Sequence, residues 1–447
     1  QAIFGFHVVS SLIALCILSK LGPRLSFLAL LVRGLIRYIA PSNEDLRAML
    51  PARKEEGKAR KRRQREEDER GFNIPRQTPL ELKATHVRIE ELERFPLFFS
   101  LHWLCLYVPV CLAVYTVSEL YNHLVVKATD LNVSIVWLLV GVAFSLQVLV
   151  SLTALLLRAD DERSLLFSLS ILTFFTLFVL TVFVDRLFDV NLLEAYTHLR
   201  VSAARMANED QAVEVKPDSP LLLYISFVVL FTTIGCGLIF PSFRYASMYT
   251  KAKESAPPAT KILLHVTFVL PAVVIMLFTH PMRQYLTEGR RQYLTQGQLE
   301  ILRVYLSLIW TTLRLVIARP LLQAHLDLAY FKVLALQRQT GKIRNTDLQS
   351  LIFRYYSYLC PAISQFLAPS FLVALLALLL KTTAGLHWDG APIAPLSTPA
   401  DPASFSAVFN PTVCRAVFSV SLLCITLTNF GLSMVGVAYY GYFDHEF

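Results

Sequence analysis

Long apolar stretches limit the fold of this 447-residue chain more than any other feature. A transmembrane helix needs about 20 consecutive apolar residues, because each residue adds about 1.5 Å of length. Within a bilayer the backbone must satisfy its own hydrogen bonds, which favours helices. The predicted spans are nine stretches near residues 2–19, 95–121, 133–157, 165–184, 220–240, 262–280, 299–318, 355–380 and 412–439.

The composition agrees with a membrane protein. Hydrophobic residues make up 55% of the chain and charged residues 17%, against about 45–50% and about 25% in soluble domains. The seven cysteines lie in the apolar stretches and form no CxxC pair, so they indicate neither a disulfide framework nor a zinc site. We expect an all-α, polytopic integral membrane helical bundle with about nine transmembrane helices.

Two amphipathic helices are expected beside the spans. Near residues 25–40, Arg33 and Arg37 share one helical face and apolar residues lie opposite, which is typical of a helix in the membrane interface. Near residues 320–345, apolar residues recur at helical spacing after Pro320, which suits the first turn of a helix. This second helix is predicted to be cytosolic and to lie along the membrane.

Residues 51–70 form a charged segment with nine basic and six acidic side chains. On a polytopic chain this composition favours a solvated cytosolic loop that touches anionic lipid, and we expect no nucleic-acid partner. The chain is therefore divided into residues 1–40 (first span and interfacial helix), residues 41–94 (basic, largely cytosolic segment) and residues 95–447 (a bundle of about eight spans).

The distribution of Lys and Arg predicts the orientation. One set of alternate loops carries 30 of these residues and the opposite set carries 9, with most of the contrast in loop 20–94. The richer set, placed in the cytosol, is residues 20–94, 158–164, 241–261 and 319–354. The N-terminus is then outside or lumenal and the C-terminus cytosolic, in the plasma membrane or a secretory-pathway membrane. Residues 2–19 could also be a signal peptide, but a retained span is favoured because no basic segment precedes them as given.

Asn132 begins the sequon Asn132-Val133-Ser134 and falls on the outer side of this threading. It is the candidate glycosylation site.

No catalytic motif is present in the sequence. We find no GxSxG, Walker loop, HExxH or GxGxxG pattern. His325 and Asp327 lie two residues apart on a predicted helix and therefore point in nearly opposite directions. We expect no enzymatic activity, no metal site and no cofactor.

The most informative polar residues lie in the seventh span. Eleven residues separate Arg303 from Arg314, almost three helical turns, so both lie on one stripe with Ser307 and Trp310. Apolar residues cover the rest of this helix. Because a charge facing lipid is costly, the stripe should face protein or water.

Partners for the stripe are predicted from depth in the membrane. Glu119 is the first choice for Arg303 and Asp185 the second, since all three lie near the outer boundary. Arg314 has no carboxylate in another span at its level and should point toward other polar groups, backbone carbonyls or water. The candidates for an inner polar layer are His102, Gln147, His265 and Gln365. The favoured interpretation is that each of these groups joins two helices, and a solute or ion pathway is the alternative.

Several stretches are similar to the transmembrane protein 161 family and occur in the same order along most of the chain. They are IRYIAPSNEDLR, LNVSIVWLL followed by DDERS, LIFPSFRYASM, LLHVTFVLP, LRLVIARPLLQAHLDLA, GKIRNTDLQ, and YYSYLCPAISQFLAP with LLLKT. The resemblance implies a polytopic eukaryotic membrane protein. It implies no particular reaction, ligand or catalytic residue, and the loops around 51–85 and 381–411 depart from the family pattern.

Three hypotheses about function stay open. The first is a non-enzymatic, membrane-embedded regulator or partner of another membrane protein, with an influence on ion or solute handling. The second is a channel or secondary transporter that uses the arginine stripe. The third and weaker hypothesis is an intramembrane enzyme that uses His102 or His265. A hydrated cavity reaching the stripe would favour transport, and a dry interior with paired polar groups would favour the regulator.

Overall fold

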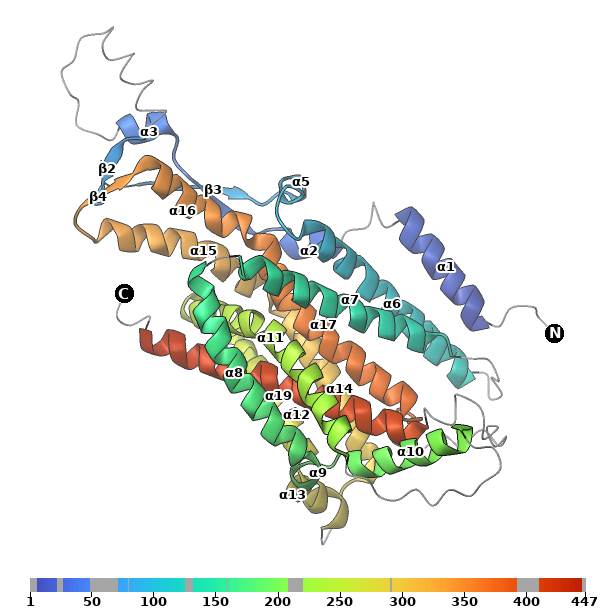
Figure 1. Cartoon of the computed structure of the whole chain (residues 1–447). Helices are drawn as coiled ribbons and strands as arrows, with labels where there is room; N and C mark the ends of the chain where they lie inside the picture. The colour runs from blue at the N-terminus through green and yellow to red at the C-terminus, as the bar shows by residue number, and fades with distance from the viewer. Residues whose placement is uncertain are drawn as a thin grey trace, which may run out of the picture.

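Long helices run side by side through most of the molecule (Figure 1). The structure is a computed structural model that describes residues 6–21, 27–48, 71–78, 80–124, 132–158, 160–207, 220–289, 292–391 and 410–443. Within these residues, two small antiparallel sheets of two strands each accompany the helices. The chain is a polytopic helical membrane protein.

In the described part of the chain, six helical stretches are long and apolar enough to cross a membrane, and one bent pair of helices raises the number to seven. The long helices are α6 (Phe98–Leu124), α7 (Ser134–Leu156), α11 (Leu221–Ser255), α12 (Pro258–Phe278), α17 (Leu359–Thr383, continuous with α16) and α19 (Pro411–Phe443). Shorter apolar helices occupy the first and fourth predicted spans, in α1 (Phe6–Leu21) and α8 (Asp160–Val182). Each of the nine predicted stretches therefore coincides with an apolar helix.

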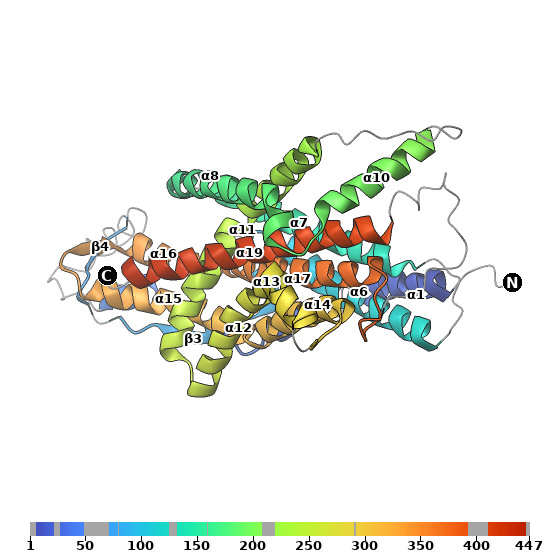
Figure 2. The same cartoon turned by 90° about the horizontal axis from the view of Figure 1, so that it is seen from below.

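Helix α17 forms the centre of the bundle. Every residue from Leu359 to Lys381 is buried. It packs against α6, α7, α11, α19, α14 (Gln296–Val316) and α15 (Ala318–Gln337). Figure 2 shows α8 and α10 (Leu192–Ala207) at one edge of the molecule, and the contacts place α8 on α11 and α10 on α19.

The bent pair consists of α14 (Gln296–Val316) and α15 (Ala318–Gln337), which meet at an angle of 47°. Pro320 lies in the first turn of α15. Its ring nitrogen has no hydrogen to donate to the carbonyl of Val316, and its ring crowds that carbonyl, so the helical hydrogen-bond ladder is interrupted at this position.

Short elements close one end of the bundle, which we call the α9 end. They are α9 (Val184–Leu187), α10 (Leu192–Ala207), α13 (His280–Arg283) and a π-helical turn η1 (Gln284–Glu288). The first residues of α14 and α19 reach the same end, because α10 packs against α19 and η1 against α14.

The opposite end, which we call the strand end, combines segments that are far apart in sequence. They are α2 (Phe27–Val32), β1 (Ile36–Ile39), α3 (Asn43–Ala48), β2 (Asn73–Pro75), β3 (Lys83–His86), α5 (Ile89–Leu92), β4 (Lys342–Arg344) and α16 (Asn345–Ser357). Strand β1 pairs with β3, and β2 pairs with β4. A small apolar core joins Leu46, Phe72 and Ile74 to Leu348 and Ile352.

The β2–β4 pairing joins the segments 20–94 and 319–354, which the sequence places on one side of the membrane. Ile74 lies opposite Ile343 in the register, and Asn345 accepts a hydrogen bond from the Phe72 backbone at 3.0 Å. The two segments are therefore neighbours in the fold, and that they face the same side of a membrane stays a prediction. That this side is the cytosol stays a prediction as well.

The interfacial helix predicted near residues 25–40 is wrong in its second half. Helix α2 ends at Val32, and Gly34 has a φ of +89°, which breaks the helix. Residues 36–39 form β1 instead, since β-branched and aromatic side chains suit a strand and β3 supplies a hydrogen-bonding partner.

The helix predicted near residues 320–345 is correct over most of its length but ends early. Helix α15 covers Ala318–Gln337, and residues 342–344 form β4. Gly341, with a φ of +120°, turns the chain back toward β2. The side chain of Gln323 on α15 also bonds the Ile36 backbone, so α15 packs on β1 rather than standing alone.

Candidate functional site

The arginine stripe lies on α14, whose start is fixed by a capping box. The Thr295 side chain accepts from the backbone N–H of Gln298, and the Gln298 side chain accepts from the backbone N–H of Thr295. Arg303, Ser307, Trp310 and Arg314 are all buried, whereas Ile309 and Val316 on the other face are exposed. The stripe faces protein.

Arg303 is 2% exposed and bonds a carboxylate and a carbonyl. Its Nη2 donates to Asp189 Oδ2 at 2.9 Å, and Nε and Nη2 both donate to the Leu277 carbonyl, at 3.1 and 2.9 Å. Its guanidinium also lies 4.5 Å from the centre of the Phe278 ring. The buried charge is therefore compensated by one acid, one carbonyl and one aromatic face.

Asp189 is held in place by the turn that follows α9. Its backbone N–H donates to the Phe278 carbonyl at 2.8 Å, beside a short antiparallel bridge between Phe188 and Thr279. The segment after α9 is thereby fastened to the end of α12. Asp189 lies four residues beyond Asp185 in a stretch of mixed polarity, and no spacing rule in the sequence distinguishes the two.

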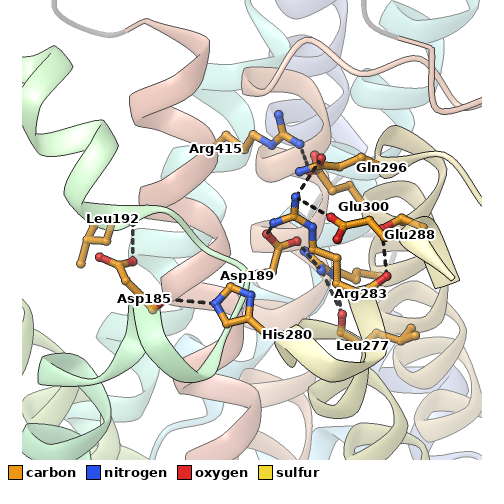
Figure 3. A network of polar contacts seen from close by, with 12 residues as sticks. Asp185, Asp189, Leu192, Leu277, His280, Arg283, Glu288, Gln296, Glu300 and Arg415 are labelled. Atoms are coloured by element: carbon orange, nitrogen blue, oxygen red, sulfur yellow. Dashed lines mark hydrogen bonds and ion pairs between the residues drawn. The ribbon is translucent and has the colours of Figure 1, made fainter. Parts of the chain in front are cut away.

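Asp185 has a different role. Its carboxylate accepts from the backbone N–H groups of Leu192 and Leu193 at 2.6 and 2.9 Å, so it caps the start of α10. The ring of His280 contacts the Asp185 carbonyl at 3.0 Å. Figure 3 shows both contacts beside the group of polar residues around Asp189.

Two further arginines extend the cluster (Figure 3). Arg283 Nη1 donates to Asp189 Oδ1 at 2.7 Å, so the two oxygens of Asp189 are shared between Arg283 and Arg303. Arg415, in the first turns of α19, forms an ion pair with Glu300 of α14. The α9 end is thus joined by ion pairs that connect the turn after α9, α13, α14 and α19.

A cavity of about 200 Å³ lies beside these ion pairs. Its lining includes Asp189, Glu194, Gln296, Glu300, Arg303 and Arg415. One ordered water needs roughly 15 Å³, so the cavity has room for several waters or a small solute.

Arg314 lies deeper on the stripe and occupies an aromatic cage. Its guanidinium carbon lies 4.4 Å from the ring centre of Tyr245 and 4.9 Å from those of Trp310 and Phe366. Arg314 is 2% exposed, and no described carboxylate lies within ion-pair distance. Three π-faces therefore surround this charge, where a desolvated contact is worth about 2 kcal/mol or more.

The prediction that Glu119 or Asp185 pairs with Arg303 is wrong, because Asp189 takes that place. Glu119 instead forms an ion pair with Lys381 and accepts from Trp388 Nε1 at 3.2 Å. Similar depth did not bring Arg303 and Glu119 together because α6 packs against α1, α7 and α17, whereas α14 packs against α12 and α17.

The residues expected to form an inner polar layer do not meet. Gln147 is exposed on the surface of α7, and His102 stacks on Phe98. His265 bonds the Tyr249 hydroxyl at 2.7 Å, and Gln365 donates to the Tyr358 hydroxyl at 2.9 Å. No described contact joins any of the four to another or to Arg314, so each side chain has its own local environment.

Two further sequence predictions concern the loops. Asn132 accepts hydrogen bonds from the backbone and hydroxyl of Ser134, at 3.1 and 2.5 Å, at the start of α7. Its glycosylation stays a prediction. The basic segment at residues 51–70, predicted to touch anionic lipid, lies outside the described residues.

The cluster can neutralise buried charge, fasten helix ends and offer polar groups to a small molecule. Across the described residues, no group of three or more His, Cys, Asp or Glu side chains is placed to hold a metal ion. Leu277 contributes only its carbonyl, which no side-chain pattern in the sequence could have identified.

Comparison with known proteins gives one family and no structural relative. A family model described as "Predicted transmembrane protein 161AB" matches residues 2–404. No solved structure matches the chain.

Proposed function

The chain belongs to the transmembrane protein 161 family, and on that premise we propose that it is a non-enzymatic, membrane-embedded regulator or partner of another membrane protein. Its influence on ion or solute handling would be exerted through that partner. The observation that carries the proposal is that Arg303 is bonded to neighbouring segments and Arg314 is enclosed by aromatic rings inside the bundle.

A conducting or transporting stripe would need charged groups that water or a solute can reach. Arg303 borders the cavity at the α9 end, but its bonds to Asp189 and the Leu277 carbonyl fix it in place. Arg314 is enclosed by Tyr245, Trp310 and Phe366. The bonds of Arg303 join α14 to the end of α12, and the rings around Arg314 join α14 to α11 and α17, which favours a rigid scaffold over a pathway.

The proposal includes a threading with nine spans, the N-terminus outside or lumenal and the C-terminus cytosolic. The apolar part of helix α8, Leu166–Val182, has 17 residues, or about 26 Å of length, which is at the lower limit for crossing a bilayer. Helix α1 has 16 residues, or about 24 Å, and packs along α6. The strand end would then be cytosolic and the α9 end would face outside.

A channel or secondary transporter is the second candidate, and the cavity at the α9 end favours it. Arg303 lines that cavity, so one member of the stripe lies beside a space that can hold water. Transport would additionally require a route past Arg314.

Flux and cross-linking separate the two candidates. The purified protein is reconstituted into liposomes, and chloride, potassium and glycine fluxes are compared with those of protein-free liposomes. In parallel, a photoreactive phenylalanine analogue replaces Phe167 or Phe175, both exposed on α8, in the membranes of living cells. The proposal expects no flux above background and a discrete cross-linked membrane protein. A saturable flux that Arg303→Gln abolishes, or cross-links to lipid alone, would contradict it.

A further inference from the structure

The cavity at the α9 end contains hydrogen-bonding groups of both charges that the protein leaves unused. Glu300 is 5% exposed, and one of its oxygens pairs with Arg415. The other oxygen, Oε2, is buried with no hydrogen-bond partner among the described residues. A buried carboxylate oxygen without a donor is costly, so this position calls for an N–H or O–H group.

Donors are unused on the same cavity wall. A guanidinium has five N–H groups, and Arg303 uses only Nε and Nη2 in its bonds to Leu277 and Asp189. Arg415 uses Nη2 toward Glu300. Both arginines line the cavity, so their remaining N–H groups are available to an anionic group there.

We propose that this cavity binds a small zwitterion, with its carboxylate or phosphate on Arg303 and Arg415 and its ammonium group on Glu300. Glu194, exposed on α10 at the cavity, adds a second carboxylate beside the ammonium. Both oxygens of Asp189 are already occupied by Arg283 and Arg303. Asp189 therefore orients Arg303 and does not contact the ligand.

A ligand of one charge alone fits less well. An anion would leave Glu300 Oε2 without a donor and would lie beside Glu194 and Glu300. A cation would leave the free guanidinium groups unpaired. A zwitterion satisfies both sets, and the volume of about 200 Å³ suits a molecule the size of a small amino acid.

The unpaired oxygen also predicts which nitrogen group is recognised. A primary ammonium has N–H groups that Glu300 can accept, whereas a quaternary ammonium has none. Two sources carry the required chemistry: a free amino acid in solution, and the headgroup of a lipid such as phosphatidylethanolamine. Glycine betaine and phosphatidylcholine are the matched quaternary controls.

The test measures thermal unfolding of the full chain in nanodiscs of phosphatidylglycerol. Glycine and L-alanine are titrated from solution, with glycine betaine, acetate and methylamine as controls. In a second arm, phosphatidylethanolamine or phosphatidylcholine replaces part of the lipid. Stabilisation by glycine or alanine identifies a free zwitterion, and stabilisation by phosphatidylethanolamine alone identifies a lipid headgroup.

Variants show whether the effect arises in the cavity. Glu300→Gln should weaken binding at least about 10-fold, because a charge-assisted hydrogen bond is lost. Glu288→Gln is the matched control, since Glu288 lies at the same end but its side chain is 60% exposed, with a longer ion pair to Arg283. Thr412→Trp, at an exposed position on the cavity wall, should block binding without altering the core, so it decides the question if Glu300→Gln does not fold.

The proposal is overturned if no primary-amine zwitterion stabilises the protein. It is also overturned if the quaternary controls stabilise equally, or if Thr412→Trp leaves the stabilisation unchanged.

Discussion

Asp189→Asn removes the carboxylate that compensates Arg303, and the structure predicts how much stability is lost. Asp189 accepts from Arg303 at 2.9 Å and from Arg283 at 2.7 Å, and its side chain is 4% exposed. The Arg283 side chain is 23% exposed, so solvent screens that pair and limits it to about 1 kcal/mol. Arg303 is left buried without its counter-charge, which typically costs about 3–5 kcal/mol. We expect at least about 3 kcal/mol in total.

The assay is reversible unfolding in mixed detergent and dodecyl sulfate micelles, followed by tryptophan fluorescence. Glu288→Gln is the control and should cost no more than about 1 kcal/mol, because that ion pair is exposed. A double-mutant cycle then isolates the pair. Asp189→Asn with Arg303→Gln should recover part of the loss, whereas Glu119→Gln with Arg303→Gln should be additive within about 0.5 kcal/mol.

Two results would refute this reasoning. One is that Asp189→Asn lowers the free energy of unfolding by no more than about 1 kcal/mol beyond the loss for Glu288→Gln. The other is a coupling between Glu119 and Arg303 as strong as that between Asp189 and Arg303, because it would restore the pairing expected from depth alone.

Three further predictions concern the interior, the α9 end and the topology. Arg314→Met should change the free energy of unfolding by less than about 1.5 kcal/mol, because no carboxylate is left unpaired and replacing a buried charge by an apolar side chain is often neutral. A loss above about 3 kcal/mol in the same unfolding assay would mean that Arg314 makes contacts beyond the aromatic cage. Gly297→Ala should lower the free energy of unfolding by about 1–3 kcal/mol, since an added Cβ would lie 1.9 Å from the Gly390 carbonyl oxygen. Gly431→Ala is the control and should not destabilise, because nothing lies within 4 Å of its added Cβ. Equal thermal shifts for the two variants would exclude the close contact. Lys83→Cys and Thr340→Cys should both react with an impermeant thiol reagent only after permeabilisation, and labelling of either in intact cells would overturn the proposed orientation.

Much of the helical architecture could be predicted from the sequence because bilayer length and apolar composition act locally. Each apolar stretch predicts a helix from its own length and composition, and its neighbours in the bundle need not be known. The burial of α17 on all sides does not follow from its composition, because α7 and α12 are at least as apolar and are less than half buried.

The strand end could not be predicted because its structure depends on pairing between distant segments. Ile36–Ile39 forms a strand because Lys83–His86 lies beside it, and Lys342–Arg344 does so because of Asn73–Pro75. The local pattern of Arg33 and Arg37 also fits a helix, and only the tertiary partner and the positive φ of Gly34 decide between the two.

At the site, helical spacing placed Arg303 and Arg314 on one stripe but could not identify their partners. Depth is a single coordinate, whereas pairing also depends on which helices are neighbours. Glu119 has a suitable depth, but it lies on α6 and meets Lys381 of α17. Asp189 became a partner only because the turn after α9 is fastened to the end of α12.

Thiol accessibility along the stripe tests the central claim, a closed arginine stripe, most directly. In a background without the native cysteines, Ser307→Cys and Thr311→Cys report on the buried stripe, and Thr412→Cys reports on the cavity. We predict that an impermeant thiol reagent, applied to both faces of the membrane, labels only the cysteine at position 412. After denaturation all three should react. Labelling at position 307 or 311 in the native protein would mean that water reaches the stripe, and it would contradict the account in favour of a pathway.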